Sequence, residues 1–290
     1  MAVIRERKIG NQMFYYIEHS IRQGKKVLKK EKYLGKKLPD DTNKLKEAFV
    51  KEINNEKFYP VLDQIKKNFV KELKQTPKVA KEKNLESFGV KFTYDSQRIE
   101  GSTLSLRETA NLLEKGISPN EKPVQDIKEA EAHQKLFLEI LDYEKDLSLA
   151  VVLDWHKELL CNSKIAGLIR KHQVLISGSK FKPPFSAELE VLLREFFSWY
   201  VKSKIHPVEL AALVHLKFVT IHPFADGNGR ISRLMMNFVL SKHDFPLLDI
   251  HYEDRNSYYN ALERSQVKND ETIFLKWFFK RYIKEYKKYV

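Results

Sequence analysis

The residues best suited to chemistry lie in one stretch, from His222 to Arg233, which reads His-Pro-Phe-Ala-Asp-Gly-Asn-Gly-Arg-Ile-Ser-Arg. An imidazole has an unperturbed pKa close to neutrality, so His222 is suited to take a proton from a hydroxyl group. Asp226 supplies a hard oxygen ligand of the kind that Mg²⁺ binds together with phosphate oxygens. The stretch therefore combines a candidate base with a candidate metal ligand.

The second half of this stretch is suited to binding phosphate groups. Gly227 and Gly229 have no Cβ, so the backbone can turn tightly there and approach a ligand closely. A helical pattern begins at this point, and the free N–H groups of a helix N-terminus attract anions. Arg230 and Arg233 are three residues apart on one helix face, from which both can reach a polyphosphate. Base, metal ligand and phosphate-binding groups together indicate chemistry on an Mg²⁺–nucleotide.

The stretch also has simpler interpretations. Asp-Gly-Asn-Gly is also an ordinary turn sequence, and a histidine before a turn is often structural. A calcium-binding EF-hand loop requires Asp or Asn where Arg230 stands and Glu where Asn237 stands, so calcium is excluded. A phosphate-binding P-loop requires Gly-Lys-Ser/Thr after the glycines, and none follows.

The stretch resembles the signature of the Fic (Fido) family, His-x-Phe-x-Asp/Glu-Gly-Asn-Gly-Arg-x-x-Arg, at all eight fixed positions. Fic proteins are helical and mostly transfer AMP from ATP to a hydroxyl side chain of a target protein, with release of pyrophosphate. The resemblance covers about residues 86–275. It implies an Mg²⁺-dependent protein adenylyltransferase, with Mg²⁺ as cofactor and ATP as co-substrate.

The resemblance also implies a role for each residue of the stretch. His222 would be the general base for the target hydroxyl, and Asp226 would hold Mg²⁺. Phe224 would be a buried anchor. The nucleotide phosphates would be bound by Gly227, Asn228, Gly229, Arg230 and Arg233, with Arg233 nearest the γ-phosphate.

A second motif lies upstream, where Ser96-Gln97-Arg98-Ile99-Glu100-Gly101 resembles the Fic inhibitory motif Ser/Thr-x-x-x-Glu-Gly/Asn. In the family, the glutamate pairs with the second arginine of the signature and blocks placement of the γ-phosphate. The resemblance therefore implies that Glu100 inhibits the enzyme by pairing with Arg233. A carboxylate can compete with a phosphate for one guanidinium. The alternative is that Glu100 is an ordinary charge at the end of a helix.

Two further segments resemble parts of Fic proteins that bind substrates. The residues around 167–184 read as a hairpin and resemble the Fic flap, which binds a target segment by β-augmentation through Val174, Leu175 and Ile176. A purely structural hairpin remains the alternative. Tyr259, with Tyr258 before it, resembles the helix that cradles adenine. Gln266 stands where relatives often have asparagine, so the adenine contacts stay open.

The elements that must position these residues are mainly helical. Residues 1–40 read as a basic β-meander, 41–85 as a helical connector, and 86–290 as the Fic domain, with an inhibitory helix at about 86–101 and a catalytic core at about 148–275. We therefore expect a mainly α fold, a Fic-type helical bundle with a β-hairpin flap and a small N-terminal β-meander. Helix caps and breakers predict helices at about 41–53, 58–73, 79–98, 106–115, 124–143, 148–161, 187–202, 207–221, 229–242, 254–266 and 271–288.

Composition restricts the class of protein. The 290 residues include 42% hydrophobic residues, which indicates a globular chain, and no apolar run is long enough to span a bilayer. The first residues become charged before a signal core can develop, and the single cysteine, Cys161, cannot form an internal disulfide. We expect a soluble, cytoplasmic protein without membrane partners.

The net charge of +13 is concentrated at the two ends of the chain. Residues 1–83 contain 22 lysines and arginines against 11 aspartates and glutamates, whereas residues 84–275 are slightly acidic. A nucleic-acid-associated regulator that binds through the basic N-terminal segment is therefore one alternative function. Removal of AMP from a modified protein, with Glu100 positioning a water molecule, is another. A homodimer is left open, and the target protein is not readable.

Overall fold

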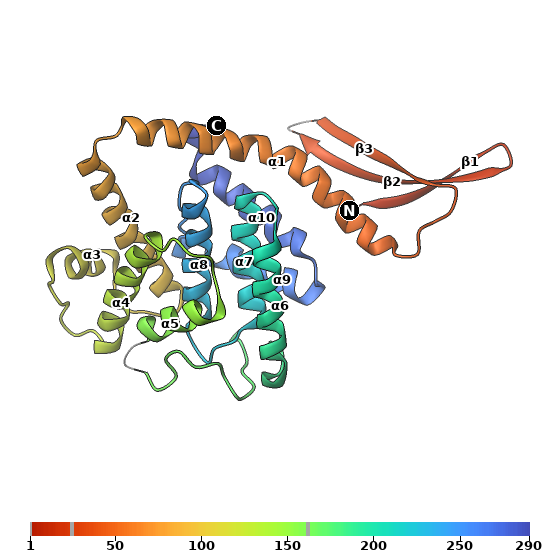
Figure 1. Ribbon diagram of the computed structural model, residues 1–290. Coiled ribbons are helices and arrows are strands. Elements are labelled where there is room, and N and C mark those ends of the chain that lie inside the picture. Colours follow the sequence, from red (N-terminus) through yellow and green to blue (C-terminus); the bar gives the residue numbers. More distant parts are fainter. Residues whose placement is uncertain (1, 24–25, 161–162) are drawn as a thin grey trace. The chain divides into compact units, whose positions relative to one another are not determined.

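The computed structural model of the chain describes residues 2–23, 26–160 and 163–290 (Figure 1). It is mostly helical, with one small antiparallel sheet, which confirms the predicted fold class. The chain divides into two compact units, Met1–Val61 and Leu62–Val290. Cys161 lies outside the described residues. No helix in the described ranges is both long and apolar enough to cross a membrane.

The first unit contains the predicted β-meander. Strands β1 (Val3–Ile9), β2 (Gln12–Gln23) and β3 (Lys26–Gly35) are antiparallel in the order β1-β2-β3. A three-stranded sheet of this size needs a packing partner. Here Ile17 of β2 is buried against Phe49 and Ile53 of the following helix.

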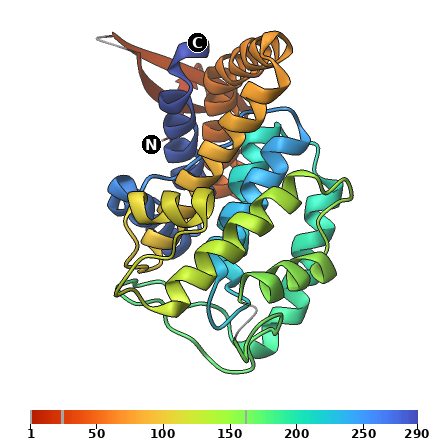
Figure 2. The same cartoon turned by 90° about the vertical axis from the view of Figure 1, so that its left-hand side faces the viewer.

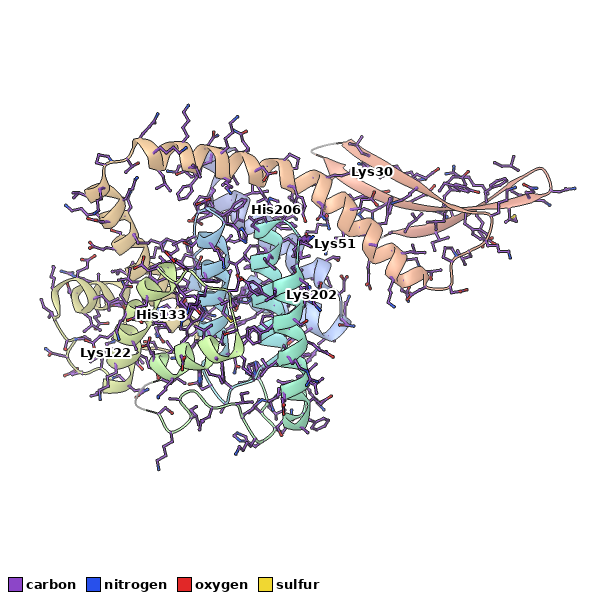
Figure 3. The ribbon with its side chains drawn as sticks, in the orientation of Figure 1. Lys30, Lys51, Lys122, His133, Lys202 and His206 are labelled. Carbon is purple, nitrogen blue, oxygen red and sulfur yellow. The ribbon has the colours of Figure 1, made fainter. Side chains whose placement is uncertain are left out.

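Several basic residues of the meander make ion pairs within the first unit. Lys30, labelled on β3 in Figure 3, pairs with Glu56, and Lys32 pairs with Glu52 at 2.7 Å. Lys29 donates to the carboxylate of Glu18 at 2.7 Å. Part of the positive charge is thus compensated locally, and the nucleic-acid interpretation of this segment stays a prediction.

Helix α1 (Thr42–Gln75) corrects the prediction of two helices in this part of the chain. The helix is continuous and contains Pro60. A proline inside a helix removes one backbone hydrogen bond and strains one turn. Burial of apolar residues on both sides of the proline offsets that cost. Ile53, before the proline, is buried in the first unit, and Leu62, after it, is buried in the second. The division between the compact units falls inside α1, between Val61 and Leu62, and the domain boundaries proposed after residues 40 and 85 stay predictions.

The second unit is a helical bundle whose helix ends follow local signals. Ser105 accepts a hydrogen bond from the Glu108 amide in a capping box, and Gly116 ends the same helix with φ of 66°. Pro207 occupies the first turn of another helix. The helices are α2 (Lys78–Ile99), α3 (Leu106–Lys115), α4 (Val124–Leu141), α5 (Leu149–Leu159), α6 (Leu189–Lys202), α7 (Pro207–Ile221), α8 (Asn228–Lys242), α9 (Arg255–Lys268) and α10 (Glu271–Glu285), with short 3₁₀ turns at Ser186–Glu188, Tyr252–Asp254 and Lys287–Tyr289.

Helices α7 and α8 form the centre of this bundle. Nearly every side chain of both helices is buried. Helix α7 packs on α6, α8 and α10, and α8 also packs on α2, α4 and α5. Figure 2 shows the bundle from the side of α3 and α4. The loop that connects α7 to α8 therefore lies between two helices that contact most of the other helices of this unit.

The segment predicted as a hairpin flap has no strands among residues 163–185. It makes a turn in which the Ser179 amide donates to the Ile176 carbonyl at 3.1 Å, with Gly178 at φ of 74°. Gln173 Nε2, a side-chain atom, donates to the Pro183 carbonyl across the loop at 2.9 Å. The prediction of a β-hairpin was wrong because side-chain hydrogen bonds, not a backbone ladder, join the two arms.

Candidate active site

The loop between α7 and α8 is held at both ends by left-handed backbone conformations. His222 has φ of 51° and ends α7, and its amide still donates to the Phe218 carbonyl at 3.0 Å. Gly227 has φ of 81° and caps α8. The left-handed residue His222 stops α7 sharply, and the left-handed Gly227 turns the chain into the start of α8. The loop is therefore short, and its ends have defined directions.

Asn228 closes the loop on itself. Its Oδ1 accepts from the Phe224 amide and its Nδ2 donates to the Phe224 carbonyl, both at 2.9 Å. Asn228 is 3% exposed, so these two hydrogen bonds are buried inside the loop. Phe224 is buried and stacks on His156 with ring centroids 3.7 Å apart. The structure thus gives Asn228 a loop-closing position, and its contact with phosphate stays a prediction.

His156 of α5 joins three parts of the site, although sequence analysis did not single it out. Its Nε2 lies 3.0 Å from the Asp226 carbonyl, and its Nδ1 accepts from the Gly167 amide at 2.9 Å. These partners require a neutral ring that carries its proton on Nε2. Burial lowers the pKa of His156, which favours that form. A Cβ at Gly227 would approach this ring to 3.2 Å, so the glycine allows the close packing.

His222 is oriented as a base requires. Its Nδ1 lies 3.2 Å from the Val219 carbonyl, an acceptor, so the ring proton resides on Nδ1 and the Nε2 lone pair is left free. Burial is the largest effect on the pKa of His222 and lowers it, and the Arg170 guanidinium acts in the same direction. The carboxylates of Glu100 and Asp226 raise it by smaller amounts. The ring is therefore neutral at neutral pH.

A cavity of about 530 Å³ opens beside His222. It has room for a small organic ligand of several rings and phosphates. Its walls come from the end of α2, the loop after α5, α7, the start of α8, and α9. The lining residues are Ile99, Glu100, Ile176, Ser177, Gly178, Ser179, Val219, His222, Gly229, Tyr258, Tyr259, Asn260, Leu262, Glu263 and Gln266.

The two signature arginines point to different places. Arg230 is 2% exposed; its Nη2 donates to Asp226 Oδ2 at 3.0 Å, and its Nη1 pairs with Glu129 of α4. Its Nη1 also lies 3.3 Å from Gln97 Oε1. Arg230 therefore orients the Asp226 carboxylate and ties α8 to α2 and α4. Its predicted contact with phosphate stays a prediction.

Arg233 is bound by the upstream motif. It is 1% exposed, and its Nη2 donates to Glu100 Oε1 at 2.8 Å and to the Ser96 carbonyl at 3.0 Å. Its Nε donates to Ser96 Oγ at 3.1 Å. Nη1 of Arg233 has no hydrogen-bond partner among the described residues. Ser96 and Glu100 of the upstream motif thus bind the same guanidinium group and leave its Nη1 atom without a partner among the described residues.

The carboxylate of Glu100 occupies the N-terminus of α8. A Cβ at Gly229 would overlap Glu100 Oε1, so the carboxylate lies directly against the first turn of that helix. The positive end of the helix dipole favours an anion there. Glu100 therefore sits where a phosphate group of a bound nucleotide would be attracted.

Of the remaining predicted site residues, Tyr259 and Ile176 line the same cavity, whereas Val174 and Leu175 do not. Tyr259 is 44% exposed, and its hydroxyl donates to the Ile99 carbonyl at 2.9 Å. Ile176 contributes to the wall, whereas Val174 is half-buried and Leu175 is 78% exposed. The turn of this loop is tethered to α9, because the Lys180 amide donates to Glu263 Oε2 at 2.9 Å. The structure brings the cavity walls together but leaves Leu175 facing solvent.

Two buried side chains support the site and were missed in the sequence. Arg170 donates from Nε to the His222 carbonyl at 2.8 Å, and from its two Nη atoms to the His172 and Pro184 carbonyls at 3.0 and 2.7 Å. His133 of α4, labelled in Figure 3, lies 2.9 Å from Thr93 Oγ1 of α2. Only an alignment or a structure could have found them, because their partners are distant in sequence.

Arg170→Lys is expected to lower the free energy of unfolding by about 3 kcal/mol, because lysine can replace only part of three buried charge-assisted hydrogen bonds. Urea unfolding of the two proteins measures the difference. Arg264→Lys, at an exposed arginine of α9, is the matched control and should change the free energy little. Equal losses in the two variants would show that Arg170 is not a structural clamp.

Comparison with known proteins agrees with this geometry. Residues 146–240 match the model of the Fic/DOC family. Two curated relatives are both named protein adenylyltransferase Fic. The protein from Aedes aegypti is 32% identical over 240 residues, covering 80% of this chain and 47% of its own length, and that from Drosophila yakuba is 34% identical over 178 residues, covering 59% and 36%. The chain thus spans about half, or less, of the length of these relatives.

Two solved structures share the fold. A Fic domain containing signaling protein from Bacteroides thetaiotaomicron superposes with a TM-score of 0.70 and 27% identity, over 78% of this chain and 95% of that one. Fic-1 from C. elegans superposes with a TM-score of 0.69 and 25% identity, over 86% of this chain and 77% of that one. The α7–α8 loop, its signature residues and the family match all fall within one segment. Residues 146–240 of this chain are therefore a domain of the Fic/DOC family.

Proposed function

We propose that this protein is an Mg²⁺-dependent protein adenylyltransferase, which transfers AMP from ATP to a hydroxyl side chain of a target protein, and that Glu100 inhibits it. The observation that carries the proposal is the cavity in which a neutral His222 faces the α8 N-terminus. The names of the relatives from Aedes aegypti and Drosophila yakuba support the same activity.

In the proposed reaction, His222 removes the proton of the target hydroxyl. The oxygen of that hydroxyl bonds to the α-phosphorus of ATP, the bond to the pyrophosphate oxygen breaks, and the proton moves to His222 Nε2. The Val219 carbonyl accepts a hydrogen bond from the Nδ1–H group throughout and keeps the ring in the required tautomer. Arg170 holds the His222 backbone in place.

Asp226 is the residue that fits Mg²⁺. Its side chain is 57% exposed, and its two oxygens are oriented by the Gly227 amide at 2.6 Å and by Arg230 at 3.0 Å. Each oxygen keeps a second lone pair for a metal ion. Bound Mg²⁺ would neutralise phosphate charge.

Glu100 accounts for inhibition by competition for one binding place. Its carboxylate holds Arg233 and covers the first turn of α8, both of which suit a terminal phosphate. Nucleotide that binds beside Glu100 must place its γ-phosphate elsewhere, which moves the α-phosphorus out of line with the hydroxyl.

The proposal is tested by label transfer. The full chain is incubated with Mg²⁺, cell lysate and ATP labelled either at the α- or at the γ-phosphorus. Protein labelled from α-labelled ATP alone is the expected result, because AMP retains that phosphorus. Labelling from γ-labelled ATP alone would indicate a kinase, and absence of both labels even with Glu100→Gly would overturn the assignment.

Asp226→Ala is expected to lower Mg²⁺-dependent AMP transfer by at least about 10²-fold, because the carboxylate that fits the metal is removed. The rate is measured over a range of Mg²⁺ concentrations. Asp142→Ala, at an exposed aspartate after α4, is the matched control and should behave as wild type. Activity of Asp226→Ala that persists in excess chelator would contradict the metal role.

A further inference from the structure

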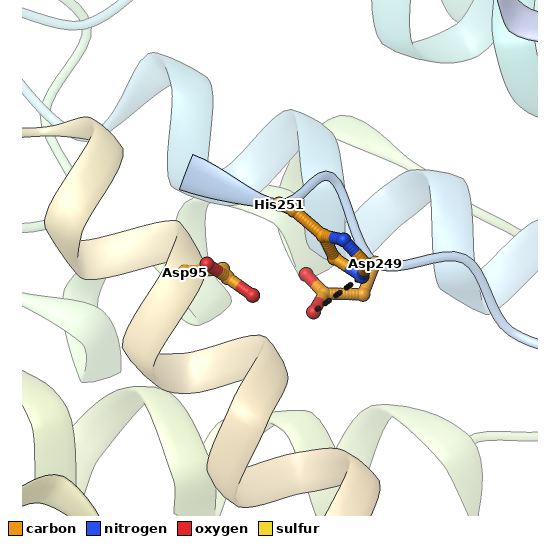
Figure 4. Close-up of side chains that lie close together, drawn as sticks. All are labelled: Asp95, Asp249 and His251. Atoms are coloured by element: carbon orange, nitrogen blue, oxygen red, sulfur yellow. Dashed lines mark ion pairs between the residues drawn. The ribbon is translucent and has the colours of Figure 1, made fainter. Parts of the chain in front are cut away.

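Two carboxyl groups and an imidazole meet away from the cavity, between α2 and the segment that connects α8 to α9. Asp95 lies on α2, and Asp249 and His251 lie on the connecting segment (Figure 4). One potential ligand atom from each of the three lies within 4.8 Å of the other two. Asp95 is 1% exposed and Asp249 is 4% exposed, whereas His251 reaches the surface in part. None of the three belongs to the proposed nucleotide site.

Three carboxyl oxygens of this cluster lack hydrogen-bond partners. These oxygens are Oδ1 and Oδ2 of Asp249 and Oδ2 of Asp95, and none of them has a hydrogen-bond partner among the described residues. Oδ1 of Asp95 does accept from the Tyr252 amide at 2.8 Å, which fixes that carboxyl group and leaves Oδ2 directed at Asp249. A buried carboxylate without donors is costly. Burial and the neighbouring Asp95 accordingly raise the pKa of Asp249 well above its usual range.

The charged neighbours do not fill the space between the two carboxyl groups. Lys91 is exposed, and its Nζ lies 3.1 Å from His251 Nε2. Arg281 donates to the backbone carbonyl of Asp249 at 3.3 Å and pairs with Glu285. Both cations lower the local negative potential, but neither makes a hydrogen bond to the three unpartnered oxygens.

We propose that Asp95, Asp249 and His251 bind one divalent cation of the zinc class. Carboxylate oxygen and imidazole nitrogen are ordinary zinc ligands, and three protein ligands leave a fourth position for water. Ligand atoms around a tetrahedral zinc ion are about 3.3 Å apart, given bonds of about 2.0 Å. His251 Nε2 and Asp249 Oδ2 are 3.8 Å apart, so a small adjustment closes the site. Imidazole disfavours Mg²⁺ and Ca²⁺, which prefer oxygen.

The cation would tie α2 to the segment after α8. Asp95 directly precedes Ser96, which holds Arg233, so the tie would act on the half of α2 that ends at Glu100. Because a ligand that binds only the folded state stabilises it, zinc should raise the melting temperature. This expectation is independent of adenylyl transfer.

The test uses the full chain, freed of metal by chelator and dialysis, and titrated with ZnCl₂. Calorimetry is expected to show one strong site per chain, and the melting temperature is expected to rise by several degrees. His251→Gln should weaken zinc binding by at least about 100-fold, since it removes a ligand. Asp249→Asn changes a buried carboxyl group and so puts folding at risk. His251→Gln keeps both buried carboxyl groups and avoids that risk. His172→Gln, at an exposed histidine of the loop after α5, is the matched control and should bind as wild type.

Lys91→Ala provides an independent check. Lys91 Nζ contacts His251 Nε2, the atom that would bind the metal. Removal of the lysine side chain therefore frees this atom and should tighten zinc binding several-fold. Wild type that binds no zinc, or equal binding by wild type and His251→Gln, would overturn the proposal. If, in addition, Asp249→Asn melts at a higher temperature without metal, the two carboxyl groups share a proton instead.

Discussion

Replacing His222 by alanine is expected to lower AMP transfer by about 10²–10⁴-fold, the usual cost of losing a general base. Nucleotide binding should change little, because the features proposed to bind phosphate are the α8 N-terminus and Arg233, not the imidazole. The rate is measured with α-labelled ATP in the Glu100→Gly background, where transfer is high enough to follow. Nucleotide affinity is measured separately by calorimetry.

The pH dependence of transfer gives a second readout for His222. A base works only when it is deprotonated, and burial lowers the pKa of His222. Transfer should therefore continue below the pH at which an ordinary histidine becomes protonated, near 6.5. The Glu100 carboxylate raises this pKa, so its removal should move the acid limb further down. His172→Ala, at an exposed histidine, should leave both rate and profile unchanged. Full transfer by His222→Ala would reject the assigned base.

Replacing Glu100 by glycine is expected to raise AMP transfer by about 10²-fold, most visibly as self-labelling. A misplacement of the reacting atoms by about 1 Å can cost that much in rate. In wild type, Glu100 Oε1 holds Arg233 Nη2 at 2.8 Å and lies against Gly229. Glycine frees both the guanidinium and the first turn of α8 for the nucleotide. Because Glu100 caps the end of α2 and does not lie within it, the backbone effect of glycine should cost less than about 1 kcal/mol, and the loss of the carboxylate partner of the buried Arg233 adds to that cost.

The activation must act through Arg233. Glu100→Gly combined with Arg233→Ala should therefore return to a low rate. Glu144→Gly, at an exposed glutamate, is the matched control for loss of a carboxylate. Equal labelling by wild type and Glu100→Gly would show that Glu100 is only a surface charge. Faster loss of AMP from a premodified target with wild type than with Glu100→Gly would indicate the removal reaction instead.

The sequence alone predicted the chemistry proposed for the loop and the ends of most helices. Roles for His222, Asp226 and the two glycines could be proposed because their spacing within twelve residues already limits what they can do. Helix boundaries at Ser105 and Gly116 could also be predicted, because capping depends on neighbours within four residues. The β-meander followed from strand-forming residues between turns. These features depend on interactions that are local in the chain.

The family resemblance paired Arg233 with Glu100, but only the tertiary structure showed what Arg230 contacts. By their spacing alone, Arg230 and Arg233 lie on one helix face and look equivalent. The two arginines are three positions apart on α8, and their side chains point in different directions in the bundle. Arg230 contacts Glu129 of α4, and Arg233 contacts Glu100 and Ser96 of α2. The partners lie about one hundred residues or more away along the chain, so no local pattern distinguishes the two guanidinium groups.

Three further arrangements also depend on the tertiary structure. They are the hydrogen bonds of Arg170, the bridge made by His156 and the Asp95–Asp249–His251 cluster. Each joins segments that lie far apart in the sequence, and each side chain is an ordinary polar residue in its own sequence context. The loop at 167–184 shows the converse. Its residues favour strands locally, but a strand needs a partner for its backbone groups, and here side chains such as Gln173 and Arg170 satisfy the carbonyls instead. Local propensity predicts what a segment can form, and the choice is made by the groups that reach its hydrogen-bond donors and acceptors from elsewhere in the fold.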